Sequence, residues 1–147
     1  MATAEGLRTA IGERRAELHR AITEAVATWD TRPAGGDGEA AWSPREAAAH
    51  IILADWFFTN AVGRACGADK LPEPVVDAHT AGMAAAALSD IAAADDRVLQ
   101  RVTNADLATV YTGRQMGTRT VHQMLERMAT HLTEHIAQIR AVAPSTT

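Results

Sequence analysis

Two histidines near the end of the sequence, His131 and His135, have the spacing of a metal-binding pair. Four residues advance an α-helix by about 40° around its axis and by ~6 Å along it, so both imidazole rings leave one face of a helix. Imidazole nitrogen is a common ligand of zinc and of neighbouring transition metals. A pair alone is a weak signal, and a site also requires a third ligand and a cavity.

His50 is the candidate third ligand, and it follows a clear helix start. In the sequence 43–46, Ser43 suits the N-cap, Pro44 the first helical position and Glu46 the third, which completes a capping box. Trp42 stands just before the cap, where a large apolar residue can anchor the chain.

The helical position of His50 predicts that it faces the core. Asp55 points away from His50. The residues within about 60° of His50 around the helix are apolar: Ala47, Leu53, Ala54, Phe57 and Ala61. A lone buried imidazole costs free energy unless its nitrogens are paired or bound to metal. We therefore expect His50 to have a polar or metal partner.

Apolar residues recur at threes and fours in segments that predict four helices, separated by loops rich in glycine and proline. In the third segment, whether residues 75–84 join the helix is left open, and His79 is assigned to the surface. In the connector 104–117, the sequence 109–111 is extended in character. The four segments are 4–29, 43–66, 75–102 and 118–142. They predict an all-α four-helix bundle, with residues 1–147 as one domain.

Composition excludes several classes of function. Alanine is abundant and only 4% of the residues are aromatic, which favours closely packed helices over sheets. The net charge is −4 and the basic residues are scattered, so we expect no nucleic-acid or membrane partner. The sequence has one cysteine, and it contains neither an apolar signal-peptide segment nor a run of about 18 apolar residues. These features predict a cytoplasmic protein.

His50, His131 and His135 are the three histidines predicted to face the core. Three neutral imidazoles with an open position are typical of a catalytic site for zinc or a similar divalent ion. Cys66 lies ~24 Å along the helix from His50, too far to be a fourth ligand. The alternative is that His50 only forms hydrogen bonds in the core, while the pair lies at a solvated end of the bundle.

Two other motifs are rejected. The sequence 131–135 fits the inverted zincin pattern, with Glu134 as general base. Members of that family, however, are much larger chains that have a further carboxylate ligand well downstream. Only twelve residues follow His135 here. A Ser-His-Asp hydrolase is not supported either, because this sequence has no strained strand-to-helix nucleophile turn and no glycine pattern around a serine.

The sequence resembles the DinB/YfiT-like superfamily over nearly its whole length. The resemblance rests on the stretch from Trp42 to His50 and on His131-x-x-x-His135 followed by Ile136-Ala137-Gln138-Ile139. It implies an up-down-down-up bundle, commonly a homodimer, in which His50, His131 and His135 hold a divalent metal, often zinc or nickel. Members include mycothiol-dependent maleylpyruvate isomerase and transferases that use bacillithiol or mycothiol. The isomerase has Glu where this chain has His131, and it has a second domain.

The chemistry expected from such a site is activation of a low-molecular-weight thiol such as mycothiol, followed by transfer or addition to a small electrophile. The alternatives are a non-catalytic, stress-related metal-binding bundle and a metal-dependent hydrolase. Glu134 is rotated about 60° from His131 around the helix, which favours a surface carboxylate over a partner of the ligands. Tyr111, Arg114 and Arg119 are candidates for binding an anionic substrate, without a spacing argument to select them.

Overall fold

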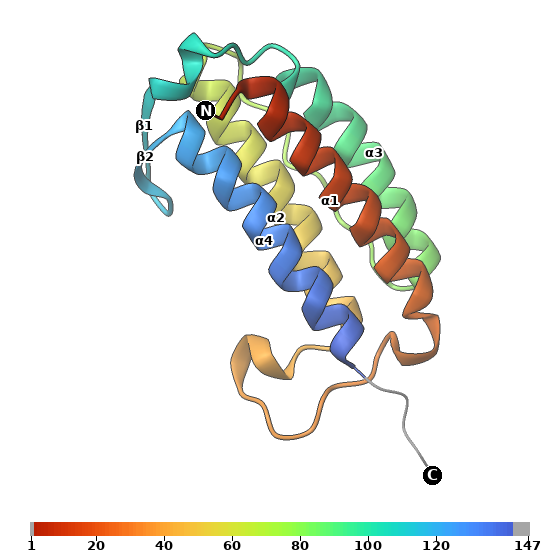
Figure 1. Cartoon of the computed structure of the whole chain (residues 1–147). Coiled ribbons are helices and arrows are strands. Elements are labelled where there is room, and N and C mark those ends of the chain that lie inside the picture. The colour runs from red at the N-terminus through yellow and green to blue at the C-terminus, as the bar shows by residue number, and fades with distance from the viewer. Residues whose placement is uncertain (1, 143–147) are drawn as a thin grey trace.

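The computed structural model describes residues 2–142, and four long helices form a bundle in it (Figure 1). The helices are α1 (Ala4–Glu24), α2 (Pro44–Ala65), α3 (Ala81–Leu99) and α4 (Val121–Ala141). α1 and α4 run in one direction while α2 and α3 run in the other, so the topology is up-down-down-up. α1 and α2 each pack between α3 and α4. The predicted all-α four-helix bundle is confirmed.

Each helix begins where a hydroxyl side chain caps it. The N-caps are Thr3, Ser43, Thr80 and Thr120, and each accepts a hydrogen bond from a backbone N–H in the first turn. The predicted capping box of Ser43 and Glu46 is present. Gly67, at φ 86°, follows the end of α2 in the left-handed region, where a side chain would be strained.

The first helix ends earlier than its sequence pattern predicts. α1 stops at Glu24, and a short 3₁₀ turn, Val26–Thr28, follows it. Trp29 is buried, and its indole N–H donates to the carbonyl oxygen of Ala78 at 2.9 Å. Val26 is 66% exposed, although the periodicity places it on the buried face. Packing of Trp29 against a distant segment accompanies this early end of the helix.

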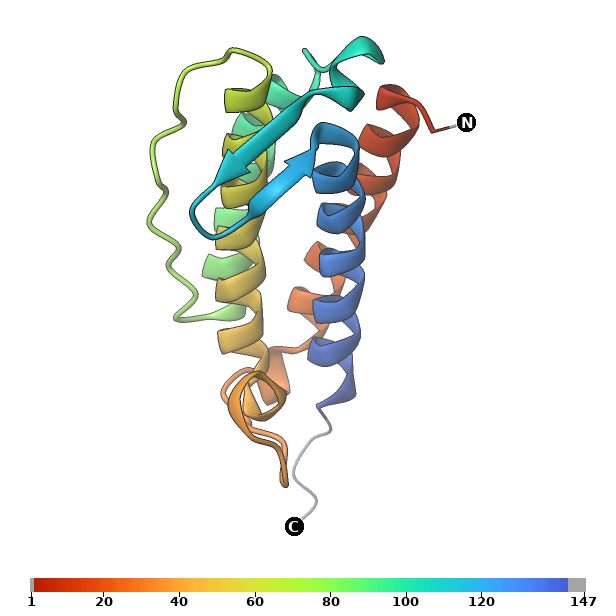
Figure 2. The ribbon, with the colours of Figure 1, turned by 90° about the vertical axis from the view of Figure 1, so that its left-hand side faces the viewer.

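The open question about the third segment is answered by Thr80. Its side chain caps α3, so residues 75–80 lie outside the helix, while Gly82 lies within it. Residues 68–80 run back along the outside of the bundle (Figure 2), and the backbone N–H of Leu71 donates to Asn60 Oδ1 on α2. His79 is exposed, as predicted.

The connector before the last helix contains a hairpin. β1 (Val110–Gly113) and β2 (Gly117–Thr120) pair antiparallel, with Val110 opposite Thr120. The extended character at 109–111 is confirmed, but the predicted start of the last helix at 118 is wrong because residues 118–120 pair within β2. The hairpin lies across α2 and the start of α4 (Figure 2). The remaining short turns are Gly38–Ala41 and Ala105–Ala108.

The core consists mainly of aliphatic side chains and methionines from all four helices. α2 and α3 approach closely at Gly63, where an added Cβ would lie 2.8 Å from the side chain of Val98. No helix within residues 2–142 is long and apolar enough to cross a membrane.

Candidate metal centre

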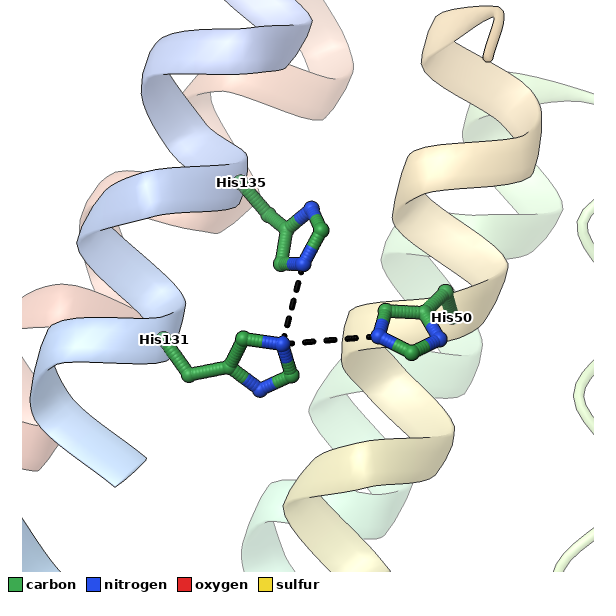
Figure 3. Close-up of side chains that lie close together, drawn as sticks. All are labelled: His50, His131 and His135. Carbon is green, nitrogen blue, oxygen red and sulfur yellow. Dashed lines mark hydrogen bonds between the residues drawn. The ribbon is translucent and has the colours of Figure 1, made fainter. Parts of the chain in front are cut away.

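The three predicted ligands meet between α2 and α4 (Figure 3). His131 Nε2 lies 3.0 Å from His135 Nε2 and 3.4 Å from His50 Nε2. One ligand atom from each residue lies within 4.8 Å of the other two. The structure therefore brings together residues that are 81 positions apart in the sequence, and the candidate centre is called the histidine cluster below.

The capped start of α2 positions His50. Trp42, immediately before the cap, places its ring 5.0 Å from that of His50 and stacks 6.3 Å from that of His135, between ring centroids. His131 and His135 come from successive turns of α4. The sequence predicts Trp42 as an anchor of the chain, and the structure shows that it also packs against two imidazoles.

The predicted burial of His50 is only partly correct. Ala47 and Ala61 are buried, but Leu53 is 38% exposed and Phe57 is half-buried, as is His50 itself. The face of α2 that carries Ile51 and Ile52 forms the core instead. His50 thus lies at the edge of the core, where one side of the cluster faces a cleft.

This cleft, the aromatic cleft, has a volume of about 510 Å³. Its walls come from α2, α4, the segment 68–80 and the hairpin: His50, Leu53, Ala54, Trp56, Phe57, Phe58, Glu73, Gln115 and His131. A volume of this size is typical of small-molecule sites. A ligand in the cleft would contact His50 and His131 directly.

Gln138 fixes the proton position of His135. Its amide nitrogen donates to the carbonyl oxygen of Glu39, so its Oε1 faces His135 Nδ1 at 2.7 Å. Oε1 can only accept, and Nδ1 must therefore carry the proton. In the neutral ring the lone pair then lies on Nε2, which faces His131 Nε2 at 3.0 Å.

The surroundings favour the neutral form of the other two imidazoles, those of His131 and His50. Burial, together with the neighbouring His135, lowers the pKa of His131 to about 4. The same two causes lower the pKa of His50 from its usual value. Neutral imidazole is the form that binds metal, so both rings have the required protonation state at neutral pH.

These donors fit a divalent cation. Metal–nitrogen distances of about 2.0–2.1 Å place neighbouring ligand nitrogens about 2.9–3.4 Å apart for angles of 90–109°, close to the two distances observed here. Without a cation, one Nε2–H of His131 can satisfy only one of its two neighbours, the Nε2 atoms of His50 and His135. All three ligands are imidazoles, which suit zinc, nickel and similar ions.

The other sequence candidates lie outside this cluster. Glu134 is exposed and pairs with Arg127 at 3.0 Å, so the interpretation as a surface carboxylate is confirmed. Cys66 is half-buried near the end of α2 and is not in the cluster. Arg114 lines a second cavity together with Tyr111, whereas Arg119 Nε donates to the carbonyl oxygen of Met116.

The contribution of Gln138 is not predicted from the sequence. Its position three residues after His135 places the two side chains on one face of a helix, which is a usable signal. The sequence does not show that the Gln138 amide is oriented by the carbonyl oxygen of Glu39, which lies 99 residues earlier in the chain.

We expect Gln138→Ala to weaken divalent-metal binding by about 10–100-fold, because loss of a partner that orients a ligand imidazole has effects of that size. Competition with a chromophoric chelator measures the affinity. Glu134→Ala, which changes an exposed residue beside His135, is the matched control and should bind as the unmodified protein does. Equal affinity of the Gln138→Ala variant and the unmodified protein would contradict the assigned role.

Comparison with known proteins identifies the family. The family model of the DinB superfamily matches residues 10–139. The fold is similar to that of a DinB-like protein from Bacillus cereus ATCC 10987 in a crystal structure, with a TM-score of 0.67 and 16% identity over 99% of this chain and 97% of that one. No curated protein matches at a significant level. The chain belongs to the DinB superfamily.

Proposed function

We propose that His50, His131 and His135 bind a divalent metal, zinc or nickel, and that the protein is a metal-dependent S-transferase or isomerase acting with a low-molecular-weight thiol such as mycothiol. The observation that carries this proposal is the convergence of three imidazole nitrogens beside a cleft of about 510 Å³. A closed structural zinc site would have a fourth protein ligand and no cleft at the ligands. The cluster offers three ligands and an open side.

The histidines would hold the cation in this proposal, while Gln138 together with Trp42 keeps the ring of His135 in position. A bound divalent cation stabilises a thiolate more than a thiol, so it lowers the thiol pKa toward neutrality.

The remaining chemistry belongs to the two substrates. The thiol proton passes to solvent, the sulfur forms a bond to the electrophilic carbon, and in a transfer reaction the leaving group departs with its electron pair. The cleft walls exclude water from one side of the reacting atoms and orient the electrophile.

The test is consumption of monochlorobimane by the metal-loaded protein with mycothiol, bacillithiol, glutathione or cysteine. We expect one of these thiols to support turnover far above the protein-free rate, and a chelator to abolish the increase. If none supports turnover although the metal is bound, the transferase proposal fails. A homodimer and a cytoplasmic location remain predictions from the sequence.

A further inference from the structure

The few aromatic residues of this chain gather around the histidine cluster. The chain has three tryptophans, two phenylalanines and one tyrosine. Only Trp29 is buried in the core, and Trp42 packs against His50 and His135. The other four line the aromatic cleft or the cavity next to it: Trp56, Phe57, Phe58 and Tyr111.

Stability of the fold does not explain this placement of the aromatic residues. Aromatic side chains bury more apolar area than any others and usually dominate a core. Here the largest fully buried side chains are aliphatic or methionine, while Trp56, Phe57 and Phe58 are only half-buried. Leu53 extends the same surface and is 38% exposed. Apolar surface left open beside a candidate metal centre indicates contact with a ligand.

The rings form a continuous wall that starts at a metal ligand. Phe58 lies edge-on to His131, with centroids 6.2 Å apart and planes at 67°. Phe57 in turn lies edge-on to Phe58, at 5.9 Å and 84°. A flat ring placed against this wall would make edge-to-face or offset contacts with Phe57 and Phe58, and its substituents would reach the histidine cluster.

The side chains that line this cleft carry little net charge. Glu73 is the one carboxylate in its lining. The neighbouring cavity, of about 290 Å³, shares Trp56, Phe57, Glu73 and Gln115 with it and adds Arg114. One acid and one base over the two adjoining cavities leave no net formal charge among their side chains, so apart from the proposed cation the cleft walls select a ligand by shape and apolar contact.

We propose that the aromatic cleft binds a flat, uncharged aromatic electrophile, whose reactive carbon lies at the histidine cluster. The proposal rests on the transferase function for the reaction, but not for the binding. With an aryl halide, the thiol sulfur forms the new carbon–sulfur bond, the carbon–halogen bond breaks, halide leaves with the electron pair, and the thiol proton goes to solvent.

Binding is tested with 1,3-dinitrobenzene, an unreactive aromatic compound that quenches tryptophan fluorescence. We expect saturable quenching by the full chain with and without a metal chelator. Leu53→Ala and Phe57→Ala should each weaken binding about three- to tenfold, the effect of losing one apolar or aromatic contact. Val26→Ala, which changes an exposed apolar residue outside the cleft, should leave binding unchanged. Leu53 is exposed enough that its truncation leaves the fold intact, as thermal melting would verify.

The reaction is tested with two electrophiles and one thiol. The kcat/KM for 1-chloro-2,4-dinitrobenzene should fall in the Leu53→Ala variant, while that for iodoacetamide, which is small and aliphatic, should not. Absence of saturable dinitrobenzene binding, equal binding by Leu53→Ala and the unmodified protein, or equal loss with both electrophiles would overturn the cleft proposal. If binding depends on Leu53 but no thiol supports turnover, the aromatic site stands and the transferase function fails.

Discussion

Replacing His50 with alanine is expected to deplete the purified protein of its divalent metal. Three imidazoles are the only protein ligands that the cluster offers within residues 2–142, and His50 is the only one from α2. Loss of a partner that merely orients a ligand lowers affinity by about 10–100-fold, so loss of a ligand should exceed about 100-fold. Elemental analysis of both proteins, purified in parallel, measures the metal content.

His122→Ala is the matched control for this experiment. His122 lies on α4, as two of the ligands do, but it pairs with Glu126 at 3.0 Å, and its side chain is 39% exposed. This control should keep near-stoichiometric metal. Added metal should also raise the melting temperature of the unmodified protein and of His122→Ala, but not of His50→Ala, because a ligand that binds only the folded state stabilises it. Equal metal content in all three proteins would remove His50 from the site.

The parts of this fold that the sequence predicts correctly are those with local causes. The capping box at Ser43 and the face shared by His131 and His135 depend on residues within one or two turns. The pairing of His50 with the late histidines is a longer inference. It succeeds because a half-buried imidazole on α2 needs a partner, and in a bundle the facing helix supplies it.

The errors have non-local causes. Trp29 is buried against Ala78, from a segment 49 residues away, which local periodicity does not contain. The pairing of residues 118–120 in the hairpin likewise replaces a predicted helical turn. Periodicity places Leu53 and Phe57 inside because apolar residues there look like core, whereas the structure uses them to line a cleft. Sequence pattern does not distinguish a core face from a ligand-binding face.

Asp55 is the clearest example of a non-local cause. The sequence shows that it points away from His50, and the structure shows that this direction leads into the core, to Arg15 on α1. Arg15 Nη2 and Nε donate to Asp55 Oδ1 and Oδ2 at 2.7 and 2.8 Å. Arg15 Nη1 donates to Asp96 at 3.0 Å, and Asp95 Oδ2 lies 3.9 Å from Arg15 Nη2. Both Asp55 and Asp95 are buried, at 3% and 1% exposed.

The two buried carboxyls differ in protonation. Burial alone raises the pKa of Asp55, but the neighbouring Asp95 carboxyl and the two bonds from Arg15 bring it below its usual value. Burial and the Asp55 charge raise the pKa of Asp95 to about 9. At neutral pH the core therefore holds one ion pair, Arg15 with Asp55, and a neutral carboxylic acid beside it.

We expect Asp55→Asn to lower the free energy of unfolding at pH 7 by up to about 3–5 kcal/mol, the cost of removing one partner of a buried ion pair, because it leaves the exposed Asp96 as the carboxylate that Arg15 hydrogen-bonds. That is a large part of the total for a domain of this size. Asp95→Asn replaces a group that is already neutral and should change stability little at acid pH. Urea unfolding, followed by circular dichroism, measures both variants.

The dependence on pH separates the two carboxyls further. Folded Asp95 keeps its proton up to a pH of about 9, whereas the unfolded chain loses it near the ordinary value. The unfolded state therefore binds fewer protons between those limits, and this residue makes stability fall as pH rises. Asp95→Asn should gain stability relative to the unmodified protein from pH 5 to pH 9. A constant difference over that range would show that Asp95 is ionised in the fold, and equal loss in both variants at pH 7 would contradict the assignment of the ion pair to Asp55.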